Sequence, residues 1–192
     1  MVDDIQNYAL FHNIEKFSLL GHSMGGNVSM LFAQKFPEII EKIIIVDIIP
    51  KKYKSHHNEI MDGLKSIDFK SKKSRREVDD HMSNYIQDDR VKQFLLKNLY
   101  WIDKENLGLK INIDVLYEFK DKLSLELQNN LNYQKPTMFL YGDLSPYVKN
   151  SDLPILKSYF TNIQIFKVPQ AGHWVHADNP SFFLDRVINF LN

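Results

Sequence analysis

The stretch Gly21-His22-Ser23-Met24-Gly25-Gly26 decides the fold of this chain, because it joins an apolar segment to an amphipathic one. Lys16 to Leu20 is predicted to form a short buried strand, and Met24 to Lys35 a helix closed by Pro37. The pattern Gly-x-Ser-x-Gly between a strand and a helix fits a nucleophile elbow, a sharp turn that holds a serine out at the edge of a sheet. We expect the glycines two positions before and after Ser23 to remove side chains that would collide there.

Ser23 is therefore the candidate nucleophile. The amide of Met24, at the amino end of the predicted helix, points to where a negatively charged oxygen would form, which makes it a candidate oxyanion donor. The alternative is a glycine-rich turn that only starts a helix, because five-residue matches also occur by chance.

Strands and helices are predicted to alternate on both sides of a long insert. A helix over residues 2–12 precedes the elbow, and apolar strands are expected over 42–47, 136–141 and 163–168, with a helix over 152–160. Asn179 and Pro180 begin the last helix. Strands that are apolar along their whole length and alternate with helices indicate an α/β fold with a mostly parallel sheet covered on both faces. The inward faces of the second and last helices are predicted as Val28, Leu31 and Phe32, and as Leu184, Ile188 and Leu191.

Residues 50–134 interrupt this alternation with a more charged and mostly helical pattern. An ordinary loop of that length is improbable in a compact domain. We expect a helical cap over the carboxyl edge of the sheet, with residues 1–49 and 135–192 forming the core.

A serine hydroxyl needs a general base, and the base needs an orienting partner. Of the seven histidines, His173 directly follows the last predicted strand, next to Gly172. It is therefore expected at the same sheet edge as Ser23, whereas His176 is expected to support it from behind.

Two aspartates compete to orient the histidine. Asp47 closes the strand beside that of Ser23, and parallel neighbours about 4.8 Å apart deliver their carboxyl ends to one place. Asp143 follows the third strand, in the usual chain order for an acid, but is expected to turn the wrong way. The slot three residues after Gly142 holds Ser145. We favour Asp47, with a helix or loop cap as its alternative role.

Composition excludes several classes of protein. The 192 residues have 44% hydrophobic content and equal numbers of acidic and basic residues, which argues against a disordered chain and offers no general attraction to nucleic acid. No cysteine is present, which excludes thiolate metal sites and a cysteine nucleophile. The acidic start does not resemble a secretory signal, and Ile43 to Ile49 is too short to span a bilayer. We expect a cytoplasmic protein that does not insert into membranes.

The sequence resembles the α/β-hydrolase superfamily and, within it, the YbfF-type bacterial esterases. The segments that carry this resemblance are 21–26, 46–50, 93–97, 145–148 and 172–177. The resemblance implies Ser23 as nucleophile, His173 as base and Asp47 as its partner, with Ser145 adding a hydrogen bond to the histidine. It also implies hydrolysis of short acyl esters and acyl-CoA thioesters, without a metal or cofactor.

One departure from the family pattern is large. Family members have several strands and a His-Gly loop before the elbow, and this chain reaches Ser23 after one helix and one strand. That loop supplies a second oxyanion donor, and losing one such donor costs about 10²–10³ in rate. A truncated product, a mis-assigned start and half of a complementing pair remain open, and so does the oligomeric state.

Two groups of residues in the expected cap have alternative roles. The apolar group fits either helix packing or an acyl pocket: Phe94, Leu95, Leu96, Tyr100, Trp101 and Tyr117. The basic group fits either a solvated surface or contact with the phosphates of coenzyme A: Lys70, Lys72, Lys73, Arg75 and Arg76. Three functional hypotheses remain: a serine hydrolase, an inactive remnant that binds an acyl ligand or a partner, and a different reaction on the same triad.

Overall fold

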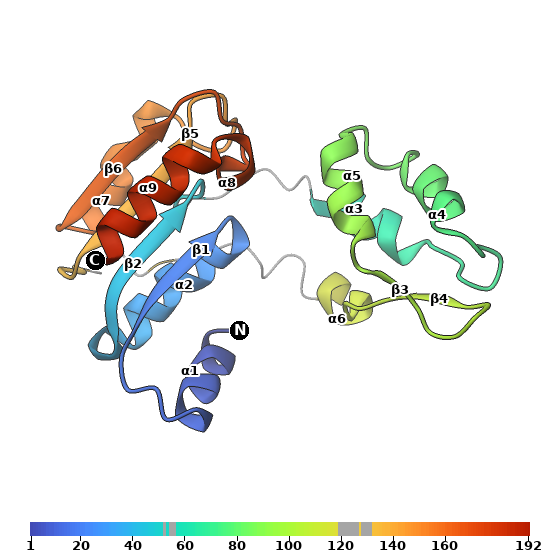
Figure 1. Cartoon of the computed structure of the whole chain (residues 1–192), viewed down its shortest axis with the longest axis horizontal. Helices are drawn as coiled ribbons and strands as arrows, with labels where there is room; N and C mark the ends of the chain where they lie inside the picture. Colours follow the sequence, from blue (N-terminus) through green and yellow to red (C-terminus); the bar gives the residue numbers. More distant parts are fainter. Residues whose placement is uncertain (52, 54–56, 119–126, 128–131) are drawn as a thin grey trace. The chain divides into compact units, whose positions relative to one another are not determined.

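The computed structural model describes residues 1–51, 53, 57–118, 127 and 132–192 (Figure 1). The chain divides into two compact units, Met1–Lys52 with Leu125–Asn192, and Tyr53–Ser124. The larger unit holds both chain ends and the elbow sequence. The expected boundaries at residues 49 and 134, and the expected place of the insert over the sheet edge, stay predictions.

The larger unit is built on a parallel sheet with the strand order β1-β2-β5-β6. Its strands are β1 (Phe17–His22), β2 (Ile40–Val46), β5 (Thr137–Gly142) and β6 (Ile163–Val168). All four predicted strands are present, although β1 extends to His22 and β2 ends one residue before Asp47. Every residue of β5 is buried, as expected for an inner strand covered on both faces. The predicted α/β fold with a parallel sheet is confirmed.

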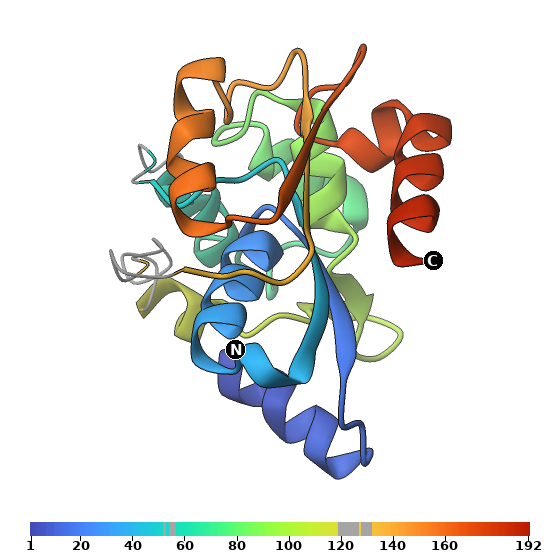
Figure 2. The same cartoon turned by 90° about the vertical axis from the view of Figure 1, so that its left-hand side faces the viewer.

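Helices cover both faces of this sheet, α2 and α7 on one side and α9 on the other (Figure 2). The side chains of β2 alternate accordingly. Ile44 and Val46 pack in one cluster with Val187 of α9, whereas Ile45 lies beside Gly26 of α2. The helical elements of this unit are α1 (Val2–Phe11), α2 (Met24–Lys35), η1 (Pro37–Ile39), η3 (Asn150–Asp152), α7 (Leu153–Tyr159), α8 (Val175–Asp178) and α9 (Pro180–Leu191).

The predicted inward face of the last helix is wrong. Val187 is buried, and Phe183 and Phe190 pack against the same core cluster. Both candidate faces have the same i, i+4, i+7 spacing, so periodicity cannot separate them, and the face with two aromatic rings buries more apolar surface. The residues of the predicted face are 53%, 53% and 41% exposed: Leu184, Ile188 and Leu191.

The buried face of α2 is also rotated from the predicted one. Phe32 is fully buried as expected, but Val28 and Leu31 are only half-buried. Met30 and Ala33 are fully buried instead, and the small residues Gly26 and Ser29 are buried on the same helix, which lets α2 approach the sheet closely.

The smaller unit has its own hydrophobic core, formed by residues that include Leu64, Val78, Met82, Leu96 and Leu107. Its helical pattern is interrupted by an antiparallel two-stranded sheet that the sequence did not predict. Its elements are α3 (His57–Lys65), α4 (Arg75–Met82), α5 (Asp89–Leu96), β3 (Leu99–Trp101), β4 (Leu107–Leu109) and α6 (Ile113–Glu118).

The apolar residues singled out in this unit do not share one role. Leu96 is buried in the core, which fits packing, while Phe94 is 47% exposed. Tyr100 and Trp101 are exposed residues of β3, so their expected helical spacing is wrong. Of the basic run, Arg75 and Arg76 are exposed on α4. No helix in the described ranges is long and apolar enough to cross a membrane.

Candidate active site

The register of the sheet brings three strand ends to one place. His22 is level with Val46, and Val46 is level with Leu140, so β1, β2 and β5 end side by side. Backbone hydrogen bonds continue the pairing by one residue, from Ser23 N to Val46 O (3.0 Å) and from Asp47 N to Leu140 O (2.8 Å). Ser23 and Asp47 therefore leave the same edge of the sheet.

Ser23 lies on a sharp turn with φ 54° and ψ −120°, a backbone conformation that costs a residue other than glycine about 1–3 kcal/mol. The turn is held because Ser23 O accepts a hydrogen bond from Asn27 N (3.1 Å) in the first turn of α2. Met24 begins this helix. Helix geometry leaves its N–H without an intrahelical acceptor, so it is available to an anion beside Ser23.

The three glycines of the elbow differ in how much space a side chain would find. A Cβ on Gly21 would lie 2.2 Å from Gly25 O and 2.4 Å from Ser29 Oγ, so the close approach of α2 to β1 requires glycine there. A Cβ on Gly25 would meet nothing within 4 Å, so the expected collision at that position is wrong. A Cβ on Gly26 would lie 2.4 Å from Ile48 Cγ2. The crowded positions are thus the first and last of the three.

His173 connects the serine to the carboxylate. Its Nε2 lies 2.9 Å from Ser23 Oγ, and its Nδ1 lies 2.7 Å from Asp47 Oδ2. An ionised carboxylate only accepts hydrogen bonds, so Nδ1 carries the hydrogen and Nε2 is left to accept from the serine hydroxyl. The structure brings the three predicted residues together in the order that general-base activation of a serine requires.

Asp47 is completely buried and adopts a left-handed backbone with φ 53°. Three donors satisfy its carboxylate: His173 Nδ1, Ser145 Oγ at 2.5 Å and Gly142 N at 3.1 Å. Ser145 was expected to bond to the histidine, and the structure differs, since its hydroxyl donates to Asp47. Its connection to the imidazole is therefore indirect, through the carboxylate.

The competing acid, Asp143, has a different partner. Its Oδ1 accepts a hydrogen bond from Ala171 N at 3.2 Å, two residues before His173. The side chain thus turns toward the backbone of the histidine loop, in agreement with the expected orientation. Asp143 therefore supports the loop, while Asp47 is the carboxylate that accepts from the imidazole.

Sequence reasoning did not find the residue that covers the imidazole. The ring of Tyr147 stacks on His173 with centroids 4.0 Å apart and an angle of 22° between the rings. Burial, and secondarily the charge of Asp47, raises the pKa of the Tyr147 hydroxyl. Tyr147 follows Ser145 by two residues in the chain, so the sequence could have placed it at the same edge of the sheet.

His22 occupies a variable position of the elbow, to which the sequence pattern gives no role. Its Nε2 lies 2.7 Å from the main-chain oxygen of His173, and the two rings are in contact at 4.7 Å between centroids. Burial lowers the pKa of His22, which opposes a positive charge beside the catalytic candidates. His176 touches the ring of His22 edge-on at 5.2 Å, which agrees with its expected supporting place.

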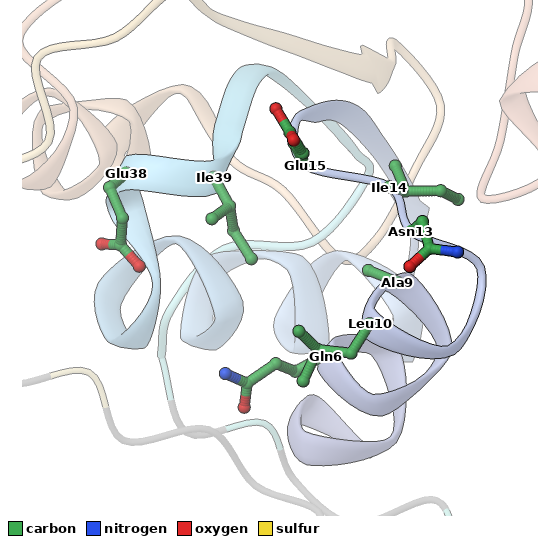
Figure 3. A pocket seen from close by; sticks show the side chains of 8 residues that line it. All are labelled: Gln6, Ala9, Leu10, Asn13, Ile14, Glu15, Glu38 and Ile39. Carbon is green, nitrogen blue, oxygen red and sulfur yellow. The ribbon is translucent and has the colours of Figure 1, made fainter.

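A pocket of about 430 Å³ lies elsewhere, at the amino edge of the sheet (Figure 3). It is formed by the end of α1, the segment that leads into β1, and η1. Its lining includes two carboxylates, Glu15 and Glu38, and the apolar side chains of Leu10, Ile14 and Ile39. Since β1 runs from this edge toward Ser23, the pocket and the hydrogen-bonded residues lie at opposite ends of the strand.

A parallel sheet with a serine on a strained turn after one strand, and a histidine after the last, defines an α/β protein of the hydrolase class. Comparison with known proteins makes the assignment specific: residues 1–180 match the alpha/beta hydrolase fold family, and the chain belongs to it. The resemblance inferred from the sequence is thereby confirmed.

Three relatives illustrate the similarity. The "sn-1-specific diacylglycerol lipase ABHD11" of Mus musculus is 35% identical over 179 residues, which cover 90% of this chain and 58% of the mouse protein. "Esterase YbfF" of Escherichia coli is 28% identical over all of this chain and 74% of its own length. A solved "Marine microorganism esterase" superposes with a TM-score of 0.91 at 32% identity, covering 98% of this chain and 75% of that one. The chain thus spans less than two thirds of the mouse protein.

Proposed function

We propose that this chain carries the catalytic centre of a serine hydrolase that cleaves acyl esters through an acyl-enzyme at Ser23. The observation that supports this most strongly is the unbroken hydrogen-bond chain from Ser23 Oγ through His173 to Asp47, with contacts of 2.9 and 2.7 Å. Its relatives are named as lipases and esterases, which favours carboxylic esters as the substrate class.

In the acylation step, Ser23 Oγ attacks the carbonyl carbon while its proton passes to His173 Nε2. The imidazolium that forms is stabilised by Asp47, which already accepts from Nδ1. When the tetrahedral intermediate collapses, the bond to the leaving oxygen or sulfur breaks and that atom takes the proton from Nε2. The acyl group remains on Ser23.

The negative charge of the tetrahedral oxygen needs donors that are in place beforehand. The N–H of Met24 is one such donor, at the amino end of α2 and next to the nucleophile. The positive end of the helix dipole favours charge at the same position. A water molecule then repeats the sequence with His173 as base, which releases the carboxylic acid and restores Ser23.

Short acyl esters and acyl-CoA thioesters are the proposed substrates, and the diacylglycerol named for the mouse relative is a third candidate. Thioesters fit the same chemistry because the thiolate is a good leaving group. The proposed contact for the phosphates of coenzyme A is the basic run of the smaller unit, with a solvated surface as its alternative: Lys70, Lys72, Lys73, Arg75 and Arg76. A preference for thioesters over simple esters therefore tests the role of the smaller unit, whereas turnover of either substrate tests the triad.

Labelling with a fluorophosphonate probe tests the nucleophile. The folded protein should be labelled, Ser23→Ala should not be, and Ser18→Ala should be labelled normally, because Ser18 is an exposed serine of β1, the strand that leads to Ser23. Hydrolysis of p-nitrophenyl esters of increasing length then gives acyl preference. Thioester cleavage is followed with a thiol-reactive dye, to which a chain without cysteine contributes no signal. An unlabelled, folded wild-type protein would contradict the proposal.

A second candidate function is binding without turnover, to an acyl ligand or a partner chain. It is favoured by β1, which pairs with β2 on one side and with no other strand in the described part of the chain, while Leu20 is 44% exposed on it. Ligand binding measured by calorimetry, with no product release and no probe labelling, would support this candidate over the first.

A further inference from the structure

The backbone that carries His173 is held at three consecutive residues by side chains from three different segments. Asp143, after β5, accepts from Ala171 N at 3.2 Å. Asp178, in α8, accepts from Gly172 N at 2.8 Å. His22, the last residue of β1, lies with its Nε2 2.7 Å from His173 O. The loop between β6 and α8 is thus tied at successive positions.

The contact from His22 differs from the other two in what it connects. His22 directly precedes Ser23, so its hydrogen bond links the backbone of the candidate base to the strand that carries the candidate nucleophile. A carbonyl oxygen only accepts, so Nε2 of His22 carries the hydrogen and donates it. The distance between Ser23 Oγ and His173 Nε2 therefore depends on a contact between the backbone of the base and the residue that precedes the nucleophile.

We propose that His22 is a positioning residue for His173: its Nε2–H fixes the main chain of the base relative to Ser23. This inference rests on the proposed serine hydrolase function. It adds a requirement that the Gly-x-Ser-x-Gly pattern does not contain, namely a hydrogen-bond donor at the position before the serine.

The surroundings of His22 favour the neutral ring, whose Nε2–H donates without adding a positive charge beside His173. Its neighbours are the rings of His173, Trp174 and His176, at 4.7, 5.7 and 5.2 Å between centroids. Burial comes first, and the nearby histidines add to it, in lowering the pKa of His22; the His173 carbonyl and the charge of Asp47 act in the opposite direction. A neutral donor holds the loop without repelling the imidazolium that forms on His173 during reaction.

Three substitutions at His22 and one control test the role. His22→Gln keeps an N–H donor near the position of Nε2. His22→Asn keeps a polar side chain that is too short to reach the carbonyl, and His22→Leu removes the donor. His12→Gln is the control, since His12 is an exposed histidine after the end of α1 whose ring packs against that of Tyr8, outside the candidate site. Thermal unfolding of each variant identifies those that fold.

The Asn and Leu variants, in which no donor reaches the His173 carbonyl, should lose about 10- to 100-fold in kcat/KM and in the rate of fluorophosphonate labelling, because a misplacement of about 1 Å has effects of this size. KM should change little, and His22→Gln should recover most of the loss. The backbone order parameters of residues 172–174 should fall from about 0.85 toward about 0.6 in the Asn and Leu variants. The His12→Gln control should behave as wild type.

Two results would overturn the proposal. One is a folded Asn or Leu variant that keeps its labelling rate within about twofold of wild type, and the other is equal losses in the Gln and Asn variants. Should wild type itself remain unlabelled, the proposed function fails, while the order parameters still decide the positioning role. An ordered loop in His22→Asn would then reject that role by itself.

Discussion

Alanine is expected to destabilise the protein at Gly21 but not at Gly25, the first and last glycines of the Gly-x-Ser-x-Gly pattern. At Gly21 the new methyl would lie 2.2 Å from the carbonyl oxygen of Gly25 and 2.4 Å from Ser29 Oγ. Backbone is the obstacle, so α2 must move away from β1 by about 1 Å. Overpacking of this kind costs about 1–3 kcal/mol, and we expect the upper end because a strand and a helix must separate.

At Gly25 the added methyl meets nothing within 4 Å, and its backbone does not have a positive φ. Alanine in a helix is favoured over glycine by up to about 1 kcal/mol, so this variant should be neutral or more stable. For a chain of this size, about 1 kcal/mol shifts Tm by about 2–4 °C. Gly21→Ala should therefore lower Tm by about 6–12 °C, and Gly25→Ala should raise it by up to about 4 °C.

Thermal unfolding followed by circular dichroism, with urea unfolding as a second measure, decides the comparison. Fluorophosphonate labelling of Gly25→Ala should be retained, because the substitution leaves Ser23 and the start of α2 in place. Equal destabilisation by the two substitutions would refute the reasoning, since it would mean that the tight turn itself, and not the contact between α2 and β1, requires glycine.

Three further predictions concern single side chains. Asp47→Asn should lower kcat for ester hydrolysis by about 10³- to 10⁴-fold. His173 and Gly142 donate to different oxygens of Asp47, and an amide has only one oxygen to accept with, so the wrong imidazole tautomer results. A loss below about tenfold would contradict this prediction. Tyr133→Phe should raise the free energy of unfolding by about 1 kcal/mol in urea titrations. The buried Tyr133 hydroxyl has no hydrogen-bond partner among the described residues, and burial raises the pKa of Tyr133 to about 12. A less stable Tyr133→Phe variant would contradict this prediction. Because the pKa of His22 is lowered in the folded state, its contribution to stability is present above the unfolded pKa of about 6.5 and is lost as the pH falls through the lower folded value. Urea unfolding between pH 8 and pH 5 should show a weaker pH dependence in His22→Gln, and an unchanged slope would exclude this contribution.

The predictable part of the fold depended on local pattern. Short apolar runs between helical patterns can be recognised without knowing the tertiary structure, so all four strands of the parallel sheet were predicted. The faces of helices were less predictable. In α9, two faces with equal spacing were available, and only contact with the sheet selected Phe183, Val187 and Phe190.

The candidate site follows the same division. Ser23, Asp47 and His173 could be proposed from the sequence, because parallel strands end at a common edge and each residue directly follows a strand or lies in the next loop. The distances and exact partners of their hydrogen bonds could not be predicted, since they depend on the register of the strands. That register gave Ser145 a different partner from the predicted one, and it brought Tyr147 onto the imidazole.

The sequence by itself thus determined which residues reach the carboxyl edge of the sheet, because residues that follow parallel strands all lie at that edge. It also determined which of these residues have the chemistry of a nucleophile, a base and an acid. Distances below 3 Å between groups more than 100 positions apart, such as His173 and Asp47, were decided only when the sheet and its helices packed. The physical reason is that hydrogen bonds are lost over fractions of an ångström, whereas a sequence pattern locates a residue only to the nearest element.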